Sequence, residues 1–110
     1  ALRERGVLIV GSGNIVHNLR TMRREVADDQ AYDWTIEFDA VTAAHMEQGR
    51  LGALSDFQQL GYLAQMAHPT WEHYLPLLYA AGAVAPDEAP RFFNDRFQAA
   101  SISMRSVVWG

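Results

Sequence analysis

The chain has 110 residues, of which 49% are hydrophobic and 20% charged, and its formal net charge is -4 at pH 7. This composition supports a buried core and excludes a disordered chain or a basic nucleic-acid-binding surface. The lack of cysteine excludes a disulfide framework, a thiolate metal site and a cysteine nucleophile. Because there is no recognisable signal peptide and no apolar run of the roughly 18 to 20 residues that a membrane span needs, we expect a cytoplasmic protein without membrane or nucleic-acid partners.

The first predicted element is a buried strand at residues 6–10, GVLIV, which ends in the glycine-rich turn GSGN. A helix is then predicted with Asn14 as its N-cap. Apolar residues from Ile15 to Val26 recur at spacings of four, three and four, which places them on one face of a helix.

A second helix is predicted to begin at Trp34 and to stop at Gly49. His45 lies at the end of its apolar stripe and is interpreted as structural. One or two shorter helices are predicted between Leu54 and Ala67, with an interruption at Gly61.

The segment HPT is predicted to separate two helices. Pro69 disfavours a helical conformation for His68, and Thr70 is a suitable N-cap for a helix that continues to Gly82. Pro76 removes one backbone hydrogen bond inside that helix, so a kink is expected there.

The polar segment APDEAP at residues 85–90 is predicted as a loop, and SISMRSVVW at 101–109 as a closing strand. The order strand, helix, helix, helix, strand indicates an α/β fold. Two strands cannot make a sheet with both faces covered, so we expect an incomplete α/β sheet domain.

The turn GSGN occupies a position where α/β proteins can bind phosphate at a helix start. Gly11 and Gly13 fit the dinucleotide fingerprint G-x-G-x-x-G, but Val16 stands where the third glycine belongs. A nucleotide-binding module is therefore the third-ranked hypothesis. His17 follows the carboxyl end of the predicted strand, where such folds place their sites; the alternative is a partly buried histidine bonded to a backbone carbonyl.

A second candidate site lies in MAHPTWEHYLPLL, residues 66–78. With Thr70 as N-cap, the ring of His73 is predicted to point out of the first helical turn, close to the extended His68. Two converging imidazoles can bind a divalent metal and transfer a proton, although such pairs are more often structural or exposed. A non-haem iron centre needs three protein ligands, and Glu72 is predicted to point away from His73.

Three blocks together carry a family resemblance: VLIVGSGNIVHNL at 7–19, AHPTWEHYLPLLYAAGA at 67–83 and SISMRSV at 101–107. They resemble the C-terminal part of the class III extradiol ring-cleaving dioxygenases, in the subgroup that includes DOPA 4,5-dioxygenase. The resemblance implies that residues 1–110 are the C-terminal segment of a single catalytic α/β domain. It also implies an enzyme that opens a catechol-type ring with O2 at a non-haem metal, usually iron(II), with zinc often found in its place.

By this resemblance His73 is a metal ligand, and His17 is a second ligand or the acid/base beside the metal. His68 is the further catalytic residue, in contact with substrate or oxygen. The remaining ligands belong to a missing N-terminal half or a partner chain, so we expect the 110 residues alone to bind iron weakly and not to turn over. The alternative is a non-catalytic binding or interaction module that keeps the metal pocket and self-associates into a homo-oligomer.

Overall fold

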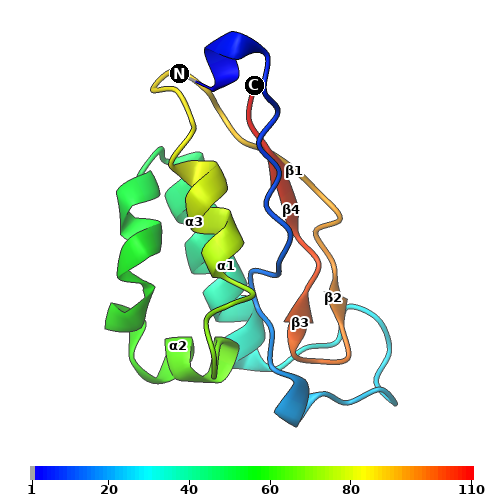
Figure 1. The fold of residues 1–110 in the computed structure, drawn as a ribbon. Coiled ribbons are helices and arrows are strands. Elements are labelled where there is room, and N and C mark those ends of the chain that lie inside the picture. Colours follow the sequence, from blue (N-terminus) through cyan, green and yellow to red (C-terminus); the bar gives the residue numbers. More distant parts are fainter. Residues whose placement is uncertain (1) are drawn as a thin grey trace.

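The computed structural model describes residues 2–110. Helices lie on one side of the molecule and short strands on the other, with the segment from residue 7 to 18 running between them (Figure 1). The helices are α1 (Asp33–Glu47), α2 (Tyr62–Ala67) and α3 (Leu75–Ala81), and the 3-10 helices are η1 (Arg3–Arg5), η2 (Leu19–Thr21) and η3 (Leu51–Leu60). The strands are β1 (Arg91–Phe93), β2 (Phe97–Gln98), β3 (Ile102–Ser103) and β4 (Ser106–Val108).

The strands form two separate antiparallel pairs. In the first, β1 pairs with β4 so that Phe92 lies opposite Val107, and in the second β2 pairs with β3 so that Phe97 lies opposite Ser103. The predicted closing strand is therefore divided into β3 and β4. The α/β class is as expected, and the sheet is incomplete within the part of the chain that the structure describes.

The helical predictions that stop at Gly49 or break at Gly61 are confirmed. α1 covers the second predicted helix, and the chain leaves it through Gly49 with a φ of 70°. η3 and α2 fill the next predicted region and meet at Gly61, whose φ of 60° requires glycine. Among residues 2–110, none of the helices combines the length and the apolar character that crossing a bilayer demands.

The predicted strand at residues 6–10 is wrong, since this segment has no regular secondary structure. The side chains of Leu8 and Val10 are 82% and 77% exposed instead of buried. A strand requires a neighbour with which to exchange hydrogen bonds, and no segment within residues 2–110 supplies one here.

The predicted helix from Asn14 is also wrong. The chain enters only the single turn η2, and the side chain of Asn18, rather than that of Asn14, accepts the capping hydrogen bond from the Arg20 amide. The apolar spacing is real, but the backbone groups of residues 14–18 hydrogen-bond to distant segments, which precludes a helical ladder.

α3 begins later than predicted. Its N-cap is Tyr74, and the Thr70 hydroxyl donates to the carboxylate of Glu72 instead of capping the helix. Pro76 consequently falls in the first turn, where its missing N–H leaves no hydrogen bond unmade, so it does not break the helix. The helix ends at Gly82 as predicted.

The core lies between α1, α2, η3 and the turn before α3. Tyr74 is fully buried there, and its hydroxyl donates a 2.8 Å hydrogen bond to the Leu54 carbonyl. Its ring packs against Phe38 and Phe57. The turn that carries His68 and His73 is therefore anchored to the interior of the protein.

Candidate metal centre

The segment at residues 14–18 is extended and is held on its helical side by backbone hydrogen bonds. The amide of Asn14 donates to the carbonyl of His73 at 2.8 Å, and the amide of His17 donates to the carbonyl of Ala67 at 3.0 Å. This segment and the turn that contains His73 are thus linked at two points.

On its other side the same segment lies against β3. The amide of Ser103 donates to the Val16 carbonyl at 3.1 Å, and His17 forms an isolated antiparallel bridge with Ile102. Residue 17 is therefore fixed by two parts of the chain that are far from it in sequence, and not by a helix as predicted.

The glycines of GSGN allow this segment to approach the start of α3. A Cβ atom at Gly11 would lie 2.5 Å from the carbonyl oxygen of Pro76, and one at Gly13 would lie still closer to the carbonyl oxygen of His73. Neither gap admits a side chain. Close backbone packing therefore accounts for both glycines without a bound phosphate.

The imidazoles of His17 and His73 are stacked, with ring centroids 3.6 Å apart and an interplanar angle of 9°. Both side chains are half-buried. The sequence had suggested that His73 converges with His68, and the structure instead stacks it against His17.

Burial, and next the neighbouring ring of His73, lower the pKa of His17 below its usual value. The His17 imidazole is therefore neutral near pH 7, with one ring nitrogen free to accept a proton or a metal. The approach of a second imidazole disfavours a cationic ring at this place.

Glu72 lies beside His73, contrary to the prediction that it points away. Its Oε1 atom is 3.5 Å from Nδ1 of His73, and the Thr70 hydroxyl, 2.8 Å from the same carboxylate oxygen, donates to it. That hydrogen bond is the main cause of the lowered pKa of Glu72. A carboxylate at one ring nitrogen commonly orients a metal-ligating histidine, so that the other nitrogen faces the metal.

The two stacked rings fit one part of a transition-metal site. Neutral imidazole nitrogens are good ligands for iron and zinc, and the pair presents one from each ring. Within residues 2–110, however, no group of three or more histidine, cysteine or acidic side chains is close enough together to hold a metal ion. The described residues therefore bring together two imidazoles, whereas a non-haem iron site needs three protein ligands.

His68 is extended, as predicted, but its side chain is only 2% exposed. Its Nε2 lies 2.5 Å from the Ile15 carbonyl oxygen. Since a carbonyl only accepts, Nε2 carries the proton, and the unprotonated Nδ1 is buried without a partner among the described residues. Burial lowers the pKa of His68 to about 4. Its contact with substrate or oxygen stays a prediction.

A buried ion pair between Asp39 and Arg105 lies next to β3, the strand that bridges to His17. The sequence did not predict this pair. Arg105 donates to both carboxylate oxygens of Asp39, with the shortest distance 2.8 Å, and the Ser103 hydroxyl donates to Asp39 at 2.6 Å. This network connects α1 to β3, which in turn bridges to His17. The spacing of Thr35, Asp39, Thr42 and Met46 could have indicated this, because these residues share with Phe38 the buried face of α1.

Comparisons with known proteins identify the family of the chain. The family model described as the catalytic LigB subunit of aromatic ring-opening dioxygenase matches residues 1–109. The chain is 36% identical to 4,5-DOPA dioxygenase extradiol of Escherichia coli K12 over 114 residues, covering 100% of this chain and 41% of that protein. It is 34% identical to the protein of the same name from Mirabilis jalapa over 88 residues, covering 74% of this chain and 30% of that protein.

A solved structure has the same fold. The crystal structure of an uncharacterized protein from Escherichia coli K12 superposes with a TM-score of 0.80 at 35% identity, covering 96% of this chain and 44% of that one. The fold and the family model define part of an aromatic ring-opening dioxygenase domain. The chain belongs to the LigB family, and the predicted resemblance to extradiol dioxygenases is confirmed. It spans about two fifths of the length of its bacterial relative.

Proposed function

We propose that this chain forms the His17–His73 wall of the active site of an extradiol dioxygenase that opens a catechol-type ring with O2. The observation that carries the proposal is the stacked imidazole pair, which lies within the residues that the family model spans. Residues 1–110 would be the C-terminal segment of a single catalytic α/β domain. The rest of that domain, in a longer polypeptide or a partner chain, would supply the remaining ligands.

In this proposal His73 holds the metal through Nε2, because Glu72 lies at Nδ1. The metal is iron(II), with zinc as the alternative. Once bound, it supplies a centre where both catechol oxygens and O2 are brought together.

His17 acts either as the second ligand or as the base that takes a catechol proton. Both roles need a neutral imidazole, and burial beside His73 lowers the pKa of His17 in the required direction. His68 is the further catalytic residue of the proposal. Its Nδ1, which has no partner among the described residues, supports the assignment because this nitrogen can accept a hydrogen bond from a bound molecule.

Oxygen uptake by a completed protein tests the proposal. The chain is joined to the part of the Escherichia coli relative that it does not match, loaded with iron(II) and given L-DOPA, which is chosen from the names of the relatives. We expect oxygen uptake and a ring-opened product, and loss of both in His73→Ala. His45→Ala, a histidine on α1 away from the pair, is the matched control and should retain activity. An iron-loaded, folded protein that consumes no oxygen with L-DOPA or catechol would contradict the proposal.

One observation favours a second candidate, a non-catalytic binding module that keeps the metal pocket. Within residues 2–110 the site has two imidazoles and no third donor close enough to hold a metal. This candidate predicts that the completed protein binds zinc or iron with no oxygen uptake, and that the chain alone forms a homo-oligomer. Light scattering after size-exclusion chromatography measures the oligomeric state.

A further inference from the structure

Asn18, the residue after His17, has a buried side chain that takes no part in the chemistry proposed above. It is 4% exposed. Its Nδ2 donates a 2.7 Å hydrogen bond to the carbonyl of Met66, and its Oδ1 accepts one from the Arg20 amide at 3.1 Å. Both ends of the side-chain amide are therefore used, in two different directions.

Two successive residues supply hydrogen bonds to the carbonyl groups at the end of α2. The last turn of a helix leaves carbonyls without a partner inside the helix. The carbonyl of Ala67 accepts from the His17 amide at 3.0 Å, and that of Met66 accepts from the side chain of Asn18. Two adjacent contacts fix the direction of the segment as well as its distance from the helix, which one contact cannot do.

The backbone of Asn18 is joined to the turn before β3. Its amide donates to the Ser101 carbonyl at 3.3 Å, and its carbonyl accepts from the Ser101 hydroxyl at 2.6 Å. Ser101 is itself fully buried. Asn18 therefore connects the helical side of the molecule to the strand side, directly beside His17.

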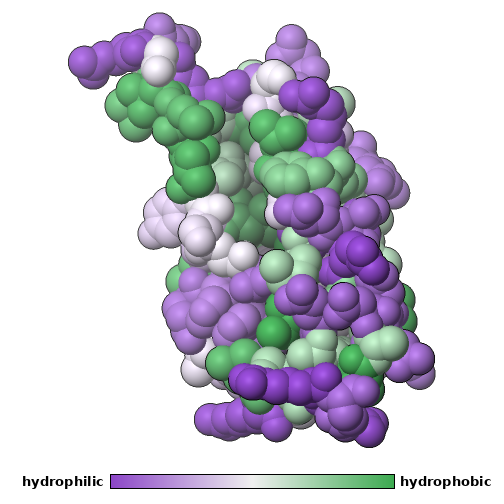
Figure 2. Space-filling model, turned by 90° about the vertical axis from the view of Figure 1, so that its right-hand side faces the viewer, coloured by the Kyte–Doolittle hydropathy of each residue, from purple (hydrophilic) through white to green (hydrophobic). Residues whose placement is uncertain are grey.

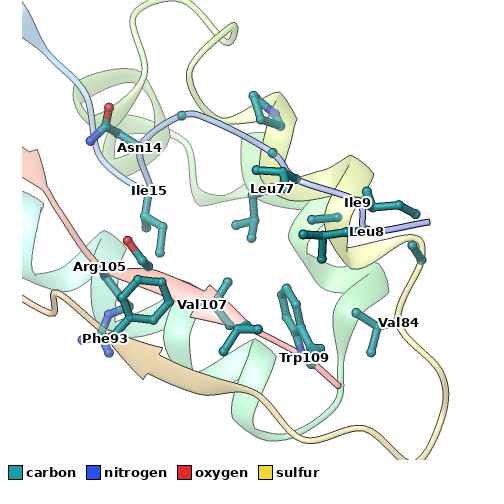
Figure 3. A pocket seen from close by; sticks show the side chains of 18 of the residues that line it. Leu8, Ile9, Asn14, Ile15, Leu77, Val84, Phe93, Arg105, Val107 and Trp109 are labelled. Carbon is teal, nitrogen blue, oxygen red and sulfur yellow. The ribbon is translucent and has the colours of Figure 1, made fainter. Parts of the chain in front are cut away.

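The chain before residue 14 gives His17 much less support. Within residues 2–110, no backbone hydrogen bond joins residues 8–13 to another segment. Figure 2 shows apolar side chains gathered around a hollow in the upper half of the molecule, and residues 7–11 line that hollow. In Figure 3 this segment follows the edge of the hollow as far as Asn14 and Ile15. The backbone position of His17 therefore depends on the contacts of residues 14–18.

The two side-chain contacts of Asn18 require an asparagine. Capping of η2 needs only an oxygen acceptor, which serine, threonine or aspartate would also provide. The contact with the Met66 carbonyl needs a donor as well. Aspartate has no N–H group, and a hydroxyl carries its donor and its acceptor on one atom that is closer to the backbone. The residue type thus matches the link to α2 and not the cap alone.

We propose that Asn18 is a positioning residue of the candidate metal centre. By holding residue 17 against the end of α2, its side-chain amide keeps the imidazole of His17 stacked on that of His73. Asn18 acts through His17 and supplies no atom to the metal, since both ends of its amide are occupied. The effects on metal binding and turnover rest on the proposed function, whereas the effect on the stacked rings does not.

Nuclear magnetic resonance of the metal-free completed protein, with labelled histidines, tests the position of the rings. Rings stacked at 3.6 Å give a nuclear Overhauser effect between their carbon-bound protons. Asn18→Ser should abolish this effect, because the serine hydroxyl can accept from the Arg20 amide but is too short to reach the Met66 carbonyl. The matched control is Thr35→Val, which also removes a buried hydrogen bond to a backbone carbonyl. Both variants should melt at a lower temperature, but Thr35→Val should keep the effect.

A double-substitution cycle shows whether Asn18 acts through His17. Asn18→Ser should lower the same quantity as His17→Ala by about 10- to 100-fold, namely zinc affinity if His17 is a ligand or kcat if it is the base. Added to His17→Ala, it should cause no further loss, because a ring that is absent cannot be misplaced. Losses that multiply would mean that the two residues act independently and would overturn the proposal.

Two results of the resonance experiment would also overturn it. One is an unchanged effect in Asn18→Ser, and the other is its loss in Thr35→Val as well, which would indicate general loosening. Asn18→Thr, closer in volume to asparagine, replaces a serine variant that does not fold. Failure of both to fold would make Asn18 a requirement of the whole fold and would refute a specific action on His17. A completed protein without zinc binding or oxygen uptake would contradict only the proposed function, because the resonance experiment needs neither metal nor substrate.

Discussion

The backbone of His73 accepts a hydrogen bond from the Asn14 amide, while its side chain stacks on His17, three residues further along the same extended segment. One segment thus fixes both the main chain and the ring of His73. The relative position of the two imidazoles is set by backbone contacts rather than by the rings themselves. Such contacts preorganise a binding site in the absence of its ligand.

Substitution of the paired histidines should separate the two roles proposed for His17. In the completed protein, His73→Ala should lower zinc affinity by more than about 100-fold, and Glu72→Gln by about 10-fold, as expected for an orienting carboxylate. If His17 is a ligand, His17→Ala should reduce affinity as much as His73→Ala; if it is the base, the protein should keep the metal and lose turnover. Competition titration with a chelating dye measures the affinities, and His45→Ala should match the unsubstituted protein.

Gly13→Ala should destabilise the isolated chain by about 1 to 3 kcal/mol, because its Cβ would collide with the His73 carbonyl and push the two backbones apart. Gly52→Ala is the control, since a Cβ there meets nothing within 4 Å and alanine favours a helical turn. Urea unfolding of both variants measures the difference. Equal stability would show that the close approach of residue 13 to His73 is absent in solution.

The free energy of unfolding should fall as the pH is lowered from 6.5 towards 4. Over this range an unfolded His68 binds a proton, whereas the buried ring, with a pKa of about 4, does not. The total loss from this residue is about 3 kcal/mol. His17, whose pKa is also lowered, adds to the loss in the same direction.

Urea denaturation at several pH values measures this dependence. His68→Gln retains an amide N–H that can donate to the Ile15 carbonyl but does not titrate, so its stability should change less over the same interval. An unchanged slope in this variant would assign the pH dependence to other groups.

Removal of one partner from the buried Asp39–Arg105 pair should be strongly destabilising. Arg105→Ala leaves a carboxylate that is 3% exposed without its cation, with an expected loss of about 3 to 5 kcal/mol. Arg96→Ala removes a pair of similar geometry at the surface, where Asp29 stays hydrated, and should lose no more than about 1 kcal/mol. Thermal unfolding of the two variants should therefore give clearly different midpoints.

The helical half of the fold was predictable because its signals are local. Apolar spacing located α1, and glycines with positive φ marked the breaks at Gly49 and Gly61. Phe38 of the predicted stripe is fully buried, but the buried face also includes Thr35 and Asp39, polar residues that the core accepts through hydrogen bonds.

The extended half was not predictable by the same rules. Residues 15–26 carry a helical spacing, yet the backbone of residues 16–18 hydrogen-bonds to Ala67, Ser101 and Ser103, which no local pattern can reveal. The strand pattern at 6–10 is local too, but a strand forms only where a partner edge exists.

The candidate residues of the site followed from the resemblance, but their arrangement did not. The family-like segments at residues 7–19 and 67–83 contain His17, His68 and His73, which were predicted as site residues. The stacking of His17 on His73 depends on backbone packing between segments distant in sequence. The buried position of His68 depends on its hydrogen bond to the Ile15 carbonyl. Family motifs locate side chains along the chain, whereas tertiary contacts decide which of them meet.

The bridge between His17 and β3 also bears on the order in which the molecule folds. An extended segment that takes its hydrogen bonds from Ala67 on one side and Ser103 on the other is not fixed until both have docked. Contacts between residues so distant in sequence form slowly, since a long loop must close first. The imidazole pair is therefore expected to assemble late, after the helices and only once the last strands are in place.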